Sequence, residues 1–121
     1  MTELKQIKQL IESNPLSFAT IDQFGNPHCI AVGDLKVVSK DKILIGDNYM
    51  AETVKNIKNN SNVALAVWNK NWKENCIGYE LKGTAEYFKS GKWYKMIKDI
   101  HKGFPAKGAI LITIQNIKKL A

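Results

Sequence analysis

Apolar residues along this chain either alternate with polar residues or recur at helical spacing, and the two patterns follow one another in short segments. Strands are predicted where alternating or β-branched runs lie between clusters of Gly, Pro, Asn, Asp and Ser. The predicted strands are 16–21, 28–32, 35–38, 43–46, 63–68, 77–88 and 109–114. Helical spacing of apolar residues predicts helices near 4–11, 50–57 and 91–101, and residues 116–121 are expected to form a short tail.

The order of these segments indicates how the strands are arranged. In the first half of the chain, strand follows strand through short turns, which favours an antiparallel sheet over βαβ units. So many short strands favour a closed or nearly closed barrel, because closure removes exposed sheet edges. Residues 63–68 contain no polar side chain, so both faces of that strand are expected to be buried. With 121 residues and no linker or repeat, residues 1–121 are expected to form a single domain.

Composition argues against several classes of protein. The chain is 45% hydrophobic, and its apolar runs are far shorter than the ~20 residues of a membrane span. The first residues, MTELKQIKQL, lack the apolar core of a signal peptide, so a cytoplasmic location is expected. Cys29 and Cys76 have neither CxxC spacing nor a neighbouring His/Cys cluster, so we expect reduced thiols and no metal site.

The net charge of +7 is carried by 18 lysines, and the sequence contains no arginine. Arginine is the usual bidentate reader of guanine and of phosphate, so a basic chain without it binds anions through point charges. The lysines are spread from Lys5 to Lys119 and form no run. A solvated basic surface explains this distribution, and nucleic-acid binding is the alternative.

Candidate catalytic side chains are few. His28 and His101 are the only histidines, and neither has a carboxylate or cysteine nearby at ligand spacing. The sequence contains no Gly-x-Ser-x-Gly elbow, no GxGxxG and no Walker loop. An enzyme with so few acid–base groups would depend on a cofactor, so we name no catalytic residue.

The segment 45–53 is the most informative one, because it runs from a predicted buried strand into the start of a helix. Such junctions present backbone N–H groups and the positive end of the helix dipole, which suits a phosphate. Asn48 and Thr53 add side-chain donors. Plain capping is the competing interpretation, with Asn48 as the N-cap and Glu52 complementing the dipole.

Three stretches in succession carry a resemblance: FATIDQFGNPHCIAVG, KILIGDNYMAETVKNIKNNSNVALAVW and GYELKGTAEYF. Their order and spacing resemble the flavin-binding split-barrel proteins related to pyridoxamine 5′-phosphate oxidase, especially the small stand-alone FMN-binding proteins. The resemblance covers nearly the whole chain. It implies a mainly β fold, a six-stranded Greek-key split β-barrel with short flanking helices. It also implies a homodimer with FMN at the subunit interface.

The same resemblance implies where FMN would lie. The isoalloxazine ring would pack along the second strand, at Ile30, Ala31, Val32 and Gly33. The phosphate would be held at the junction of the fourth strand with the following helix, at Asp47, Asn48, Met50 and Thr53. Members of the family often carry a lysine directly before that threonine, where this chain has Glu52. The oxidase's substrate site includes arginine, so we do not expect this chain to be a true pyridoxamine 5′-phosphate oxidase.

The resulting hypothesis is an FMN-binding flavoprotein, an oxidoreductase or electron carrier of unknown substrate and redox partner. Two alternatives stay open. One is a split barrel that binds another planar cofactor, a deazaflavin or haem. The other is a small basic barrel that binds single-stranded nucleic acid, which would need aromatic residues interleaved with lysine on one face. The available aromatic residues are Trp68, Trp72, Tyr79, Tyr87 and Trp93.

Overall fold

A computed structural model describes residues 2–120 and shows a mainly β protein with short helices. No helix in these residues is long and apolar enough to cross a membrane. The elements in chain order are η1 (Leu4–Ile7, a 3-10 helix), α1 (Lys8–Ser13), β1 (Leu16–Ile21), β2 (Pro27–Val32), β3 (Leu35–Ser39), β4 (Lys42–Asp47), α2 (Ala51–Asn59), β5 (Asn62–Trp68), β6 (Gly78–Phe88), α3 (Lys92–Ile100) and β7 (Gly108–Lys119).

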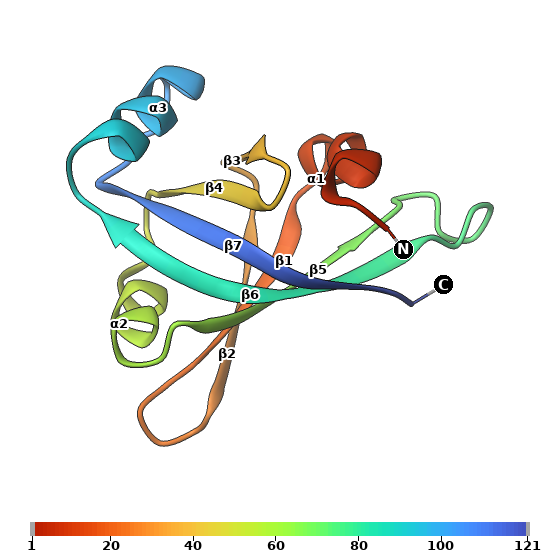
Figure 1. Cartoon of the computed structure of the whole chain (residues 1–121), viewed down its shortest axis with the longest axis horizontal. Helices are drawn as coiled ribbons and strands as arrows, with labels where there is room; N and C mark the ends of the chain where they lie inside the picture. Colours follow the sequence, from red (N-terminus) through yellow and green to blue (C-terminus); the bar gives the residue numbers. More distant parts are fainter. Residues whose placement is uncertain (1, 121) are drawn as a thin grey trace.

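One antiparallel sheet contains all seven strands of this region, in the order β2-β1-β5-β6-β7-β4-β3. The two edge strands, β2 and β3, are consecutive in the chain and are separated only by Gly33 and Asp34. From Val32 to Leu35 the chain can span at most about 11 Å, because consecutive Cα atoms lie ~3.8 Å apart. The sheet therefore curls until its edges approach each other, while β6 and β7 cross the middle of the molecule (Figure 1).

The predicted split barrel is confirmed, with seven strands in place of six. The interruption at Gly33 and Asp34 divides residues 27–39 into two strands, β2 and β3. Apolar side chains fill the barrel, with Phe18, Leu65 and Leu81 almost fully buried. A second cluster lies under α3, where Ile97 packs with Leu44 and Leu111. Strand β4 is thus buried on both faces.

One local prediction was wrong. The expected tail continues β7 as far as Lys119, because an extra residue at Gln115 forms a bulge opposite Lys82 and Gly83 and pairing with β6 then resumes. The expected burial of β5 on both faces stays a prediction, because within one chain the strand is buried on one face. Its second face is half-buried at Ala64 and Ala66.

Candidate functional site

A cavity of about 350 Å³ lies at the split of the barrel, beside the turn that joins the two edge strands. Its size falls within the range of small-molecule pockets, about 300–1,000 Å³. It is lined by Ile30, Ala31, Val32, Gly33, Asp34, Asn48, Tyr49 and Met50. The end of β2 and the β4–α2 junction, which the sequence predicted separately as ring and phosphate segments, therefore meet at one cavity.

The β2 wall of this cavity belongs to an edge strand. Strand β2 pairs only with β1, so its outer edge presents backbone N–H and C=O groups that no strand of residues 2–120 takes up. Ile30 packs against the barrel core and Val32 is buried within it, whereas Ala31 faces the other side of the sheet. A planar ligand along this edge would meet both backbone hydrogen-bonding groups and apolar side chains.

Asp47, the last residue of β4, organises the start of α2. Its carboxylate accepts hydrogen bonds from the Met50 N–H at 3.0 Å and from the Tyr87 hydroxyl at 2.6 Å. Burial and the hydrogen bond to Asp47 raise the pKa of Tyr87, which keeps the phenol protonated as the donor. Asp47 thus holds the turn that leads into α2; Met50 is the N-cap residue and makes no side-chain cap, so the interpretation of Asn48 as the N-cap was wrong. Asp47 holds the junction and has both carboxylate oxygens engaged.

Asn48 and Thr53 carry buried polar atoms that no group in residues 2–120 satisfies. The Asn48 amide nitrogen donates to the Asp34 carboxylate at 2.9 Å, while its carbonyl oxygen is buried without a partner. The Thr53 side chain is 1% exposed and its hydroxyl also lacks a partner. Thr53 lies within the first turn of α2, and neither Thr53 nor Asp47 is among the residues that line the cavity. Such orphaned groups are rare and costly in folded proteins, and a bound water, ion or ligand is one way in which they are satisfied.

Glu52, which stands where relatives often have lysine, does not line this cavity. Its side chain is 66% exposed, and its carboxylate lies 3.2 Å from the His28 imidazole. Ion pairs this exposed contribute little to stability. No lysine of residues 2–120 lines the cavity. Any phosphate bound here would depend on backbone N–H groups, the helix dipole and neutral donors.

Sequence reasoning missed one contact at this site. It found no carboxylate near His101, but the structure places the Asp34 carboxylate against the His101 imidazole, 67 residues away along the chain. Asp34 itself is buried and lines the cavity. The available signal was the interruption of a strand pattern by Gly33 and Asp34, which marks the point where the sheet edges meet.

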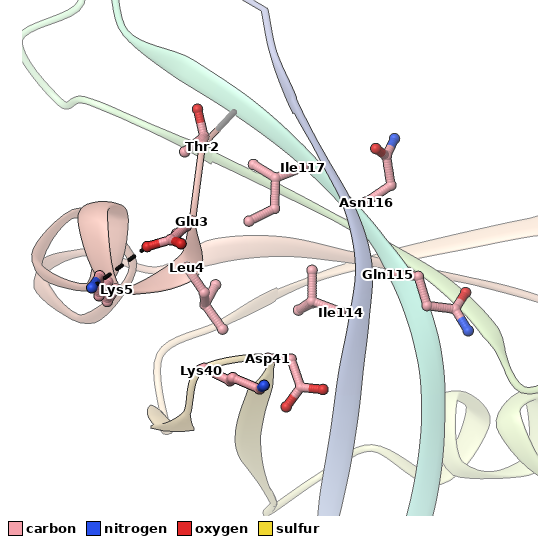
Figure 2. A pocket seen from close by; sticks show the side chains of 10 residues that line it. All are labelled: Thr2, Glu3, Leu4, Lys5, Lys40, Asp41, Ile114, Gln115, Asn116 and Ile117. Atoms are coloured by element: carbon pink, nitrogen blue, oxygen red, sulfur yellow. Dashed lines mark ion pairs between the residues drawn. The ribbon is translucent and has the colours of Figure 1, made fainter.

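A larger cavity, of about 520 Å³, lies between the N-terminal segment and the second half of β7. Figure 2 shows Leu4, Ile114 and Ile117 pointing into a common space, with Lys5 and Glu3 forming an ion pair at its side. Charged side chains of both signs surround this cavity, and none of the predicted cofactor-binding residues lines it. Residues 2–120 also contain no cluster of His, Cys, Asp or Glu that could hold a metal ion. We therefore place the candidate site at the split.

The sequence model of the pyridoxamine 5′-phosphate oxidase family matches residues 3–121. The uncharacterized protein MJ0282 of Methanocaldococcus jannaschii is 34% identical, in an alignment covering 96% of this chain and 79% of that protein. The chain therefore belongs to the flavin-binding split-barrel family of pyridoxamine 5′-phosphate oxidase, as its resemblance predicted.

Solved structures share this fold. HupZ from Group A Streptococcus has a TM-score of 0.88 at 24% identity, covering 99% of this chain and 94% of HupZ. An FMN-binding protein from Syntrophomonas wolfei has a TM-score of 0.85 at 18% identity, covering 98% of this chain and 86% of that protein. An F420 reductase has a TM-score of 0.70 at 20% identity, covering 92% of this chain and 94% of the reductase. These likenesses confirm the fold.

Proposed function

We propose that this chain binds FMN in the cavity at the barrel split and acts as a flavoprotein, an oxidoreductase or an electron carrier. The proposal rests on the convergence of β2 and the β4–α2 junction on one cavity, which Asn48 lines with its carbonyl oxygen unpaired in residues 2–120. Family membership and the FMN-binding neighbour support the choice of flavin. A bound flavin would supply the electron-transfer chemistry, and the protein would supply binding and orientation.

The phosphate would lie at the start of α2. The first backbone N–H groups of a helix have no carbonyl partner within it, so those of Ala51, Glu52 and Thr53 are available to an anion. The Thr53 hydroxyl adds one donor. Asn48 donates a hydrogen bond to Asp34, and its carbonyl oxygen, unpaired in residues 2–120, adds an acceptor that the sequence did not suggest.

The ring would lie along the outer edge of β2, at Ile30, Ala31, Val32 and Gly33. Ile30 and Met50 both line the cavity and pack against the barrel core, which gives this part of the wall a fixed apolar surface. Backbone groups at the strand edge would orient the polar rim of the ring. The substrate-side chemistry of pyridoxamine 5′-phosphate oxidase is not part of the proposal, since the chain has no arginine.

We further propose that a second copy of the chain covers the outer face of β2, β1 and β5. Strand register places small side chains side by side on that face, and Trp68 on the same face of β5 is 43% exposed. The small residues are Cys29, Ala31, Ser17, Ala19, Ala64 and Ala66. A flat face of this kind, next to the cavity, suits a homodimer with FMN at the interface. The exposed Cys29 and Cys76 are free thiols, which suits a cytoplasmic location.

The test of cofactor identity is the visible spectrum of the purified protein, followed by titration of the cofactor-free protein with FMN, a deazaflavin, haem and single-stranded DNA. We expect FMN to bind with a shifted flavin band and quenched fluorescence, and the other three ligands to bind far more weakly. Tight binding of the deazaflavin or haem in place of FMN would replace the flavin proposal. Binding of DNA alone would overturn it.

The test of the dimer is sedimentation of the wild-type chain and of Ala66→Glu, with Lys89→Glu as a matched exposed control away from this face. We expect the wild type and Lys89→Glu to be dimers. Ala66→Glu should be a monomer, because a charge would be buried at the centre of the interface. A monomeric wild type at micromolar concentration would contradict the proposed interface.

A further inference from the structure

Asp34 is a buried residue whose carboxylate occupies space that a neighbouring glycine leaves free. Its side chain is 4% exposed, and its carbonyl oxygen accepts a hydrogen bond from the Gly46 N–H at 2.9 Å. A Cβ atom at Gly46 would lie 2.8 Å from the Asp34 carboxyl carbon. Real contacts of that kind are not tolerated, so Gly46 keeps the space that the carboxylate occupies.

The Asp34 carboxylate fixes the orientation of Asn48. The Asp34 oxygen that faces Asn48 accepts a hydrogen bond from the NH₂ group of Asn48 at 2.9 Å. A flipped amide would set two oxygen atoms against each other. The Asn48 carbonyl oxygen is thereby held away from Asp34, buried and without a partner in residues 2–120. Asp34 and Asn48 both line the cavity.

His101 closes the other side of the carboxylate. It follows the last residue of α3, and its ring nitrogen Nδ1 contacts the second carboxylate oxygen of Asp34. Facing an acceptor, Nδ1 must carry its hydrogen. The ring also packs edge-on against Phe104, with centroids 5.3 Å apart. A half-exposed histidine is thus connected through one buried carboxylate to the amide at the cavity wall.

We propose that His101, Asp34 and Asn48 form a positioning relay that directs the Asn48 carbonyl oxygen at a neutral hydrogen-bond donor of the bound cofactor. The inference rests on the proposed function, because it takes the cavity to be the flavin site. On a flavin, neutral donors of this chemistry are the ring N3–H and the ribityl hydroxyls. His101 acts through Asp34 and does not itself touch the ligand. A bound donor would satisfy the acceptor that the fold leaves orphaned.

The experiment uses riboflavin, N3-methylriboflavin and lumiflavin, none of which carries phosphate, and follows flavin fluorescence on titration of the protein. N3-methylriboflavin lacks the ring donor, and lumiflavin lacks the ribityl hydroxyls. We expect wild type to prefer riboflavin over one of these two analogues by about tenfold, the size of one hydrogen bond. The analogue that is discriminated against identifies the donor.

Four variants test the relay. Asn48→Ala and His101→Ala should lose the discrimination, whereas His101→Asn should keep it, because the asparagine amide can still donate to Asp34. His28→Ala is the matched control, since the other histidine pairs with the exposed Glu52 and lies off the cavity wall. It should behave as wild type. Thermal melting of each variant checks that the fold is intact.

The rescue by His101→Asn separates positioning from a general loss of packing. Discrimination that survives in Asn48→Ala or in His101→Ala would overturn the relay, and so would a His101→Asn variant as impaired as His101→Ala. If the wild type binds riboflavin without preference over either analogue, the relay is wrong although the flavin proposal stands. If the wild type binds no flavin at all, both proposals are wrong.

Discussion

Thr53→Val separates ligand binding from folding at the proposed phosphate site. Valine has nearly the shape of threonine and replaces only the hydroxyl. In the cofactor-free protein that hydroxyl is buried and has no partner within residues 2–120. Its loss should therefore leave the free energy of unfolding unchanged or raise it by up to ~1 kcal/mol, since an unsatisfied polar atom is removed.

The affinity for FMN should fall, although the stability of the cofactor-free protein does not. A hydrogen bond to a charged acceptor contributes ~1.5–3 kcal/mol, and each 1.4 kcal/mol is tenfold in affinity. Thr53→Val, like Thr53→Ala, should therefore weaken FMN roughly ten- to a hundredfold. Thr53→Ser keeps the hydroxyl and should retain most of the affinity. Riboflavin has no phosphate and should bind all of these proteins almost equally.

Thr20→Val is the matched control for stability. Thr20 is also 1% exposed, but its hydroxyl accepts a hydrogen bond from the Asn56 amide at 3.0 Å. The valine leaves that buried amide unsatisfied, so unfolding should become easier by ~1–3 kcal/mol. FMN affinity of the folded Thr20→Val protein should not change. Urea unfolding and fluorescence titration of both variants provide the four values.

Two results would refute this reasoning. Equal FMN affinity in wild type and Thr53→Val would mean that Thr53 is only a residue of the helix start and that the phosphate lies elsewhere. A loss of riboflavin affinity equal to the loss of FMN affinity would mean that the substitution disturbs the cavity and not a phosphate contact.

Three further predictions concern the fold and the reaction. The pKa of Glu12 is lowered from 4.5: burial opposes the shift, but hydrogen bonds from Lys8 and the Val37 N–H outweigh it. The ionised Glu12 carboxylate therefore stabilises the fold above pH 4.5, and this stabilisation is lost as the pH falls through the lowered pKa. Glu12→Gln should lower the free energy of unfolding, measured with urea, by roughly 1 kcal/mol at pH 7 and by almost nothing near pH 3. Gly83→Ala should lower the melting temperature strongly, because its Cβ would lie 2.9 Å from the Thr113 carbonyl carbon in the adjacent strand; Gly103→Ala, with nothing within 4 Å, should not. The protein should form no pyridoxal phosphate from pyridoxamine phosphate with FMN and oxygen, because it lacks the bidentate arginine clamp; clear product formation would show that lysines suffice.

The strands could be predicted because the apolar residues that face the core recur at every second position. The end of β7 could not, because Gln115 and Asn116 interrupt the apolar pattern, and only the pairing with β6 shows that Gln115 is a bulge within a continuing strand. The outer face of β5 shows another limit. Apolar residues on both faces of a strand indicate that both faces will be covered, but they do not identify whether the same chain provides the cover.

The two cavity segments could be predicted from resemblance and from the strand–helix junction, since both lie in continuous stretches of sequence. The partners of Asn48 could not, because Asp34 lies 14 residues away and Asp34 in turn contacts His101 from 67 residues away. These contacts depend on how the barrel closes. They also leave the Asn48 carbonyl oxygen unpaired in residues 2–120, so Asn48 offers an acceptor where local chemistry suggested a donor alone.

A crystal structure of the protein grown with FMN would show whether the cofactor lies at the barrel split. We predict flavin density there, with the ring along Ile30–Gly33 and the phosphate at the first turn of α2 beside Thr53. Flavin density in the larger cavity between η1 and β7, or an empty split at saturating FMN, would contradict it.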